Sequence, residues 1–299
     1  MKRFAGIHTP IVTPFQQNDT VDEAGLRANI ARWMQSPLTG LVVLGSNGEA
    51  PQLDDAEADR AVSVARESVP RDRILIAGTG RESTRATIAA TRRAAAAGVD
   101  AVLVRTPSFF KAQMTTDVFV RHYTEVAEAS PVPVLLYNVA MFTGVNLAPD
   151  AVARLAAHPN IAGMKESGSD IGQIAEYVSR TPDTFVVLAG SATTLFHALC
   201  AGCDGAILAL AALVPGECVR LRTLVAEGRL EEARALQLRL MPLAKAVGTS
   251  YGVPGLKAAL ELMGFAAGPP RPPLRAAGAD VVEKIRAELA TWDFALQPR

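Results

Sequence analysis

Short apolar runs recur along the chain, and longer stretches with helical spacing of their apolar positions separate them. Eight runs are apolar on both faces, which is typical of strands in a buried parallel sheet. These predicted strands cover residues 6–13, 40–44, 73–77, 101–105, 132–137, 161–165, 184–189 and 205–210. Alanine-rich, charged stretches predict helices at 54–68, 84–97, 116–129, 149–157, 171–181 and 192–201. Strand and helix therefore alternate.

Eight strand–helix units favour closure into a (β/α)8 TIM barrel. An open doubly wound sheet would usually carry a glycine-rich phosphate turn after its first strand, whereas Thr13-Pro14-Phe15 follows here. After Pro215 the strand signals stop, and helices are predicted at 217–226, 230–247, 255–263 and 280–291. We therefore predict an α/β fold with a barrel over 1–226, which carries the active site, and a C-terminal helical appendage over 227–299.

Composition narrows the classes of partner. The chain has 49% hydrophobic and 20% charged residues among 299, enough apolar content for a large core. Its 30 basic and 30 acidic side chains balance, which argues against nucleic-acid or membrane-surface binding and favours a small-molecule partner. The first residues have no apolar signal region, and the apolar segment 205–214 is shorter than the ~20 residues of a membrane span. We expect a soluble, cytoplasmic protein.

The sequence favours neither a disulfide framework nor a metal site. Three cysteines, Cys200, Cys203 and Cys218, are few and fit a reducing compartment. Cys200 and Cys203 have CxxC spacing, but they lie in a predicted helix without a second pair, so we expect them to pack in the core. The four histidines form no ligand motif. No cofactor is expected.

Two residues at the ends of predicted strands suggest carbonyl chemistry. Lys165 ends the apolar run 161–164; burial makes an amine lose its proton more readily, and the neutral amine can attack a carbonyl to give a Schiff base. Tyr137 ends the run 132–136 and can carry a proton. Taken alone, a lysine in such a place is more often a surface residue, and a tyrosine is more often a core residue. The carboxyl ends of barrel strands carry the active site, so together they predict a catalytic pair.

A third strand end offers a site for a carboxylate. The loop Gly45-Ser46-Asn47-Gly48-Glu49 supplies backbone and side-chain donors, although an ordinary strand-to-helix turn would have the same composition. This loop, Leu136-Tyr137-Asn138-Val139 with Thr143-Gly144, and Gly163-Met164-Lys165-Glu166-Ser167 resemble the motifs of the dihydrodipicolinate synthase and N-acetylneuraminate lyase family. The resemblance covers essentially the whole chain, with the lysine 28 positions after the tyrosine.

The resemblance implies a class I lyase that needs no metal and acts on a 2-oxo acid. It implies that Lys165 forms the Schiff base, that Tyr137 and Ser46 relay the proton, and that Ser46 and Asn47 hold the substrate carboxylate. Ser167 would face the distal part of the substrate. From their strand ends, Gly190 and Ile207 are also expected to bind it. The family commonly forms a homotetramer, a dimer of dimers.

Further blocks resemble the 4-hydroxy-2-oxoglutarate aldolase branch of that family. They are Ala77-Gly78-Thr79-Gly80 with Glu82-Ser83-Thr84, His158-Pro159-Asn160-Ile161, Leu188-Ala189-Gly190-Ser191-Ala192 and Gly252-Val253-Pro254-Gly255-Leu256-Lys257. The leading hypothesis is therefore cleavage of 4-hydroxy-2-oxoglutarate to pyruvate and glyoxylate. Alternatives are pyruvate condensation with another aldehyde, as in dihydrodipicolinate synthesis, and dehydratase or aldolase action on a sugar-derived 2-oxo acid. An alternative of another class is a non-catalytic 2-oxo acid binder.

Several positions depart from the family pattern. Phe142 stands where the synthase branch has an arginine for the carboxylate of its aldehyde, and Ala140 replaces the usual proline. Phe109 stands where members usually have a tyrosine that completes the relay across a subunit interface, and phenylalanine carries no proton. Arg81 and Arg105 could receive a second carboxylate, although surface arginines more often form ordinary ion pairs.

Overall fold

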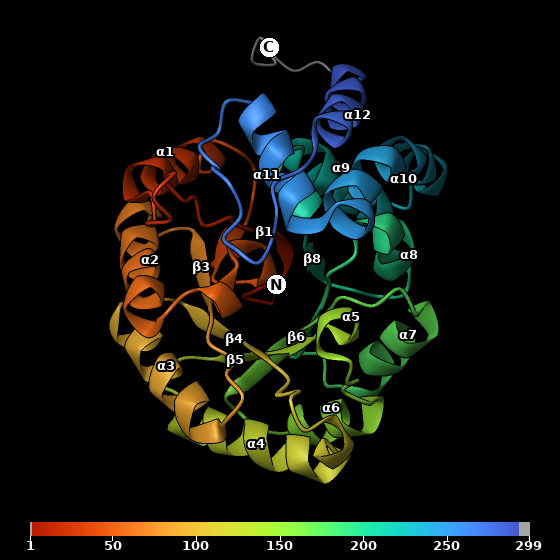
Figure 1. Cartoon of the computed structure of the whole chain (residues 1–299). Coiled ribbons are helices and arrows are strands. Elements are labelled where there is room, and N and C mark those ends of the chain that lie inside the picture. The colour runs from red at the N-terminus through yellow and green to blue at the C-terminus, as the bar shows by residue number, and fades with distance from the viewer. Residues whose placement is uncertain (1, 293–299) are drawn as a thin grey trace.

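Eight parallel strands close into a barrel in the computed structural model, which describes residues 2–292 (Figure 1). Neighbours in sequence pair throughout, and β8 pairs with β1 to close the sheet. The strands are β1 (Gly6–Pro10), β2 (Gly40–Val43), β3 (Ile74–Gly78), β4 (Ala101–Arg105), β5 (Val134–Asn138), β6 (Ile161–Glu166), β7 (Val186–Ala189) and β8 (Gly205–Ile207). The predicted TIM barrel and its eight strands are confirmed, with ends that differ by a few residues.

A ring of helices surrounds the barrel (Figure 1). It comprises α1 (Glu23–Trp33), α2 (Asp55–Ser68), α3 (Thr84–Ala96), α4 (Thr116–Ala129), α6 (Pro149–Leu155), α7 (Ile171–Arg180), α8 (Leu195–Cys200) and α9 (Pro215–Ala226). The short α5 (Ala140–Thr143) lies inside this ring, near β6 (Figure 1). Sequence reasoning missed the single-turn α5 and also α1. The signal for α1 was present: Asp22 caps the helix by accepting from the Gly25 N–H, and Leu26, Ile30 and Trp33 are buried at helical spacing.

Side chains from alternate strand positions fill the barrel interior. One buried cluster lies inside the sheet and includes Phe4, Val42, Ile76, Leu103, Leu135, Leu188 and Ile207. A second, larger cluster packs the outer faces of the strands against the helices. The pairing of β8 with β1 that closes the barrel requires glycine at position 205, because a Cβ there would lie 1.9 Å from the Gly6 carbonyl oxygen. The interior below the carboxyl ends is thus a solid core.

The C-terminal helices pack beside α1, α8 and α9 (Figure 1). They are α10 (Leu230–Lys245), a π-helical turn (Ala246–Ser250), α11 (Gly252–Leu262) and α12 (Ala279–Ala290). Asn29 of α1 anchors this part by accepting from the Ala266 N–H at 2.9 Å and donating to its carbonyl. Trp33 stacks on Phe265 with 5.2 Å between ring centroids. Of the predicted appendage, 293–299 lie outside the described residues.

Candidate active site

A one-residue irregularity in β6 determines where Lys165 points. Val134 of β5 pairs with Ile161, but the next residue pairs with Gly163, so one residue of β6 is extra. From there Tyr137 lies opposite Lys165 instead of Met164. Irregularities of this kind are common next to active sites because they redirect side chains. Here the shift turns the Lys165 ammonium into the barrel mouth, where the residue is 5% exposed.

Tyr137 links Lys165 to Ser46. The Tyr137 hydroxyl lies 3.1 Å from Ser46 Oγ and 3.5 Å from Lys165 Nζ, which points toward it. Lys165 Nζ also lies 4.5 Å from the centroid of the tyrosine ring. A chain of two hydroxyls therefore ends at the amine, which is the arrangement a proton relay requires.

The loop that carries Ser46 is held in an unfavourable backbone conformation. It forms a 3-10 turn (Ser46–Gly48) between Leu44 and Glu49, whose φ angles are 57° and 55°. Left-handed backbone at such residues costs about 1–3 kcal/mol each and persists only where surrounding contacts enforce it. One such contact is the Thr13 hydroxyl, which donates to the Gly48 carbonyl at 2.7 Å. The loop is therefore fixed before any ligand binds.

These groups line one cavity of about 120 Å³, space for roughly four water molecules or a small acid. All seven predicted site residues contribute to its wall: Ser46, Asn47, Tyr137, Lys165, Ser167, Gly190 and Ile207. Among its described lining residues, Lys165 is the one charged side chain. Hydroxyls of Ser191, Thr193 and Thr249 lie farther along the wall.

The C-terminal part also forms a wall of this cavity. Ala244, Val247, Gly248, Thr249, Gly252 and Val253 line it, from the end of α10 through the π-helical turn to the start of α11. Sequence reasoning did not anticipate this contribution. The available signal was the pair Gly248 and Gly252 between two predicted helices, since π-helical turns often lie at functional sites.

The family model described as the dihydrodipicolinate synthetase family matches residues 3–291. The chain belongs to this family. It is 35% identical over 290 residues to a 4-hydroxy-tetrahydrodipicolinate synthase of Exiguobacterium sp., covering 97% of this chain and 98% of the relative. It is also 35% identical over 273 residues to a protein named probable mitochondrial 4-hydroxy-2-oxoglutarate aldolase of Emericella nidulans, covering 89% and 88%. The crystal structure of dihydrodipicolinate synthase from Thermotoga maritima superposes with a TM-score of 0.91 at 34% identity, covering 97% and 98%.

Membership of the dihydrodipicolinate synthetase family identifies the chain as a class I lyase, an enzyme that works through a lysine Schiff base. The predicted resemblance and enzyme class are thereby confirmed. The relatives named above differ in reaction, so family membership leaves the substrate of this chain to be proposed.

Behind Tyr137 and Lys165, the next two residues of β5 and β6 form a buried polar network. Asn138 donates to a Glu166 carboxylate oxygen at 2.6 Å and accepts from the Leu147 N–H at 3.0 Å. Tyr177 of α7 donates to the Leu147 carbonyl at 2.6 Å. Burial raises the pKa of the Glu166 carboxyl, and the hydrogen bond from Asn138 opposes that shift. The network joins the strands of Tyr137 and Lys165 to the surrounding helices.

Arg81 and Arg105 line a neighbouring cavity of about 240 Å³, which shares Ser46 and Tyr137 with the first but not Lys165. Arg105 pairs with Glu82 at 2.7 Å, and Arg81 pairs with Asp55 at 3.3 Å. Both arginines therefore form ordinary ion pairs with neighbouring carboxylates.

The two phenylalanines that depart from the family pattern lie at the surface. Phe109 is 78% exposed, and its ring packs edge-on against Phe110 with 5.1 Å between centroids. Phe142 is 63% exposed and lies at the rim of the cavity. Neither supplies a hydroxyl or a cation to the cavity.

The expectation that both cysteines of the CxxC pair are core residues is wrong for one of them. Cys203 is buried, but Cys200 is exposed at the end of α8, since it faces away from the barrel. Within residues 2–292 there is no group of three or more potential metal ligands. Nor does any helix in that part of the chain combine the length and apolarity needed to cross a bilayer.

Proposed function

We propose that the chain cleaves a 4-hydroxy-2-oxo acid through a Schiff base on Lys165, with 4-hydroxy-2-oxoglutarate as the substrate and pyruvate and glyoxylate as the products. The observation that carries this proposal is the buried Lys165 ammonium within 3.5 Å of a tyrosine hydroxyl that contacts Ser46, all in one small cavity. Resemblance to the aldolase of Emericella nidulans over most of the chain supports it.

The proposed reaction begins when the Lys165 ammonium gives one proton, through Tyr137, to the C2 carbonyl oxygen and the resulting amine attacks C2. A second proton from the nitrogen lets that oxygen leave as water, which gives a protonated imine. Tyr137 then accepts the proton of the C4 hydroxyl while it passes its own proton through Ser46 to the water released in imine formation, and the C3–C4 bond breaks. The electron pair of that bond moves into the imine to give an enamine, and glyoxylate leaves as the aldehyde. Protonation of the enamine at C3 and hydrolysis of the imine release pyruvate and restore the amine.

Donors around the cavity suit an acid of this type. Ser46 and Asn47, beside the lysine, are proposed to hold the C1 carboxylate. Ser167, Ser191 and Thr193 also line the cavity, and their hydroxyls are proposed to bind the distal carboxylate or hydroxyl groups.

A second candidate is condensation of pyruvate with a carboxylate-bearing aldehyde. The synthase names of relatives such as that of Exiguobacterium sp. favour it. Phe142 argues against it, because a phenyl ring at the cavity rim cannot give the two-point hydrogen bonds by which an arginine binds a carboxylate.

Product assays with a panel of 2-oxo acids test the proposal. We expect pyruvate to be released from 4-hydroxy-2-oxoglutarate with a higher kcat/KM than from longer, sugar-derived 4-hydroxy-2-oxo acids. Release of water without pyruvate from a sugar-derived acid would assign a dehydratase instead. Faster turnover of pyruvate with a carboxylate-bearing aldehyde would assign the synthase reaction.

We also propose that the enzyme works in the cytoplasm as a homotetramer. Free thiols at Cys200, Cys203 and Cys218 support a reducing compartment. Four exposed apolar side chains support a contact between copies: Phe109 and Phe110 on the loop after β4, and Met141 and Phe142 on α5. Light scattering of the purified chain should give four times the protomer mass, and a monomer mass would contradict the assembly.

A further inference from the structure

Glu49, at the end of the Ser46 loop, forms a buried ion pair with the C-terminal part of the chain. Its carboxylate lies 2.6 Å from Lys257 Nζ of α11, and the two side chains are 0% and 2% exposed. Burial lowers the pKa of the Lys257 ammonium, and the Glu49 carboxylate opposes that shift. Two charges this deep depend on each other, because either one alone would lie unpaired in the interior.

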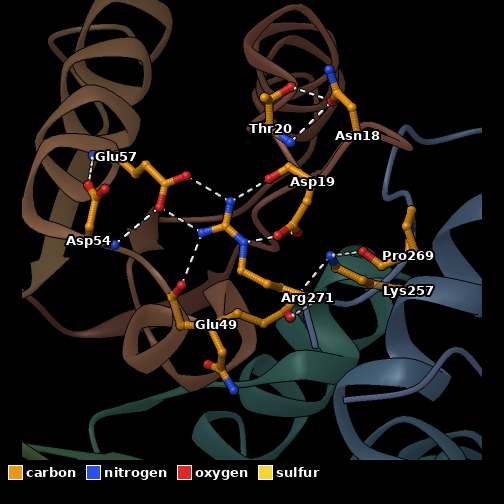
Figure 2. A network of polar contacts seen from close by, with 10 residues as sticks. Asn18, Asp19, Thr20, Glu49, Asp54, Glu57, Lys257, Pro269 and Arg271 are labelled. Carbon is orange, nitrogen blue, oxygen red and sulfur yellow. Dashed lines mark hydrogen bonds and ion pairs between the residues drawn. The ribbon is translucent and has the colours of Figure 1, made fainter. Parts of the chain in front are cut away.

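Arg271 completes the network around Glu49 (Figure 2). Its backbone N–H donates to the second Glu49 carboxylate oxygen at 2.8 Å. Its guanidinium holds both oxygens of Glu57, at 2.6 and 2.7 Å, and one oxygen of Asp19 at 3.1 Å. Lys257 also donates to the Pro269 carbonyl at 3.0 Å. The segment 269–271 is thus fixed on one side to α2 and on the other to the Ser46 loop.

The contacts of Glu49 bear directly on Ser46. The Glu49 N–H donates to the Ser46 carbonyl at 3.1 Å, and the Glu49 backbone has a φ of 55°, which a glutamate adopts only when other contacts enforce it. The Glu49 carboxylate contacts Lys257 and the Arg271 N–H, which both lie in the C-terminal part, so this part enforces the conformation.

We propose that Glu49 is a positioning residue for the carboxylate site, and that Lys257 and Arg271 lock it. The inference rests on the proposed function, in which Ser46 and Asn47 hold the carboxylate of the 2-oxo acid. Glu49 does not line the cavity that holds Lys165, and it acts by fixing the turn that presents these two side chains. The barrel alone is then an incomplete site, since its carboxylate-binding loop is held by a segment that follows the last barrel helix.

Trapping of pyruvate tests this. Wild type, Glu49→Gln and Lys257→Met are incubated with increasing pyruvate, reduced with borohydride, and the fraction carrying one reduced pyruvate is measured by mass. Each single substitution leaves one buried charge unpaired, so we expect the pyruvate concentration at half-saturation to rise about 10-fold, with little change in trapping at saturation.

The double variant Glu49→Gln/Lys257→Met removes both charges and keeps an acceptor for the Arg271 N–H. We expect it to fold even where a single variant does not, because no unpaired charge remains, and to keep a raised half-saturation, because the contact between residues 49 and 257 is lost. Asn29→Ala is the matched control: it breaks an equally buried anchor of the C-terminal part, at Ala266, without touching Glu49. Its half-saturation should stay at the wild-type value.

Unchanged half-saturation in both folded single variants would overturn the positioning role, and so would an equal rise in Asn29→Ala. A double variant with the wild-type half-saturation would also overturn it. If wild type itself traps no pyruvate, the proposed function fails and the positioning role falls with it, a result distinct from the others.

Discussion

At the scale of single residues, the account depends on three side chains from three strand ends. Lys165, Tyr137 and Ser46 could be predicted because a lysine and a tyrosine that end apolar runs are conspicuous in the sequence. Glu49, Lys257 and Arg271 could not, since charged residues in loops and helices ordinarily lie at the surface. Their burial depends on how segments more than 200 residues apart pack together.

Removing one hydroxyl tests the relay. Tyr137→Phe keeps the ring but removes the oxygen between Ser46 and Lys165, so we expect kcat for pyruvate release to fall about 10²- to 10⁴-fold, the usual contribution of a positioned proton-transfer group. Steady-state kinetics measure the change.

Tyr123→Phe is the matched control. That tyrosine is equally buried, but it donates to the Val104 carbonyl outside the active-site cavity. It should lower stability by about 1 kcal/mol and leave kcat within about 3-fold. A kcat for Tyr137→Phe near that of the control would remove Tyr137 from the relay.

At the scale of elements, the strands were the easiest to predict. A strand buried on both faces is a continuous apolar run, and all eight runs became strands. The extra residue of β6, opposite the step from Val134 to Leu135 in β5, could not be predicted. It depends on how the two strands pair, which neither strand's own sequence pattern shows. That register places Lys165 opposite Tyr137, so the position of these two side chains relative to each other is set by strand pairing.

The buried network next to the catalytic pair should be important for stability. Asn138→Ala removes the donor to Glu166 and the acceptor for Leu147, so we expect the free energy of unfolding to fall by about 2–4 kcal/mol. Because Asn138 follows Tyr137 directly and donates to the Tyr177 hydroxyl of α7 at 3.4 Å, kcat should fall as well. Denaturant unfolding and kinetics on the same samples measure both.

Asn160→Ala serves as the control. Asn160 directly precedes β6, at the end of the strand opposite the active site, and its side chain donates to the Ala127 and Ser130 carbonyls. We expect it to lose stability with kcat unchanged. A wild-type kcat in Asn138→Ala would show that the network supports the fold alone.

At the scale of the whole molecule, the barrel and the C-terminal helices form the site together. The boundary predicted at residue 226 follows a change in local pattern, but the cavity crosses it, with a wall from Ala244 to Val253. Local periodicity predicts elements and carries no information on which distant elements close a cavity.

Acid should destabilise the fold through His8, which is buried inside β1 and whose Nε2 lies 3.0 Å from the Phe4 carbonyl. Burial lowers its pKa from 6.5 to about 4. Between these values the unfolded chain binds a proton that the folded chain does not, so stability falls as pH falls from 6.5 and the loss is complete below about 4. The linkage amounts to about 3 kcal/mol.

Urea unfolding between pH 7 and 4.5 measures this term. His8→Gln, which keeps a donor for Phe4, should lose less stability over that range than wild type by about 2–3 kcal/mol. His197→Gln, at an exposed histidine, should follow wild type. Identical slopes for wild type and His8→Gln would contradict the assignment.

The most direct measurement for the whole account is the mass of the chain after borohydride reduction with pyruvate, followed by mapping of the modified residue. We expect one reduced pyruvate per chain, located on Lys165 and absent in Lys165→Ala, with the adduct retained in Lys111→Ala, a variant of an exposed lysine. An adduct that persists in Lys165→Ala, or no adduct on the wild-type chain, would contradict it.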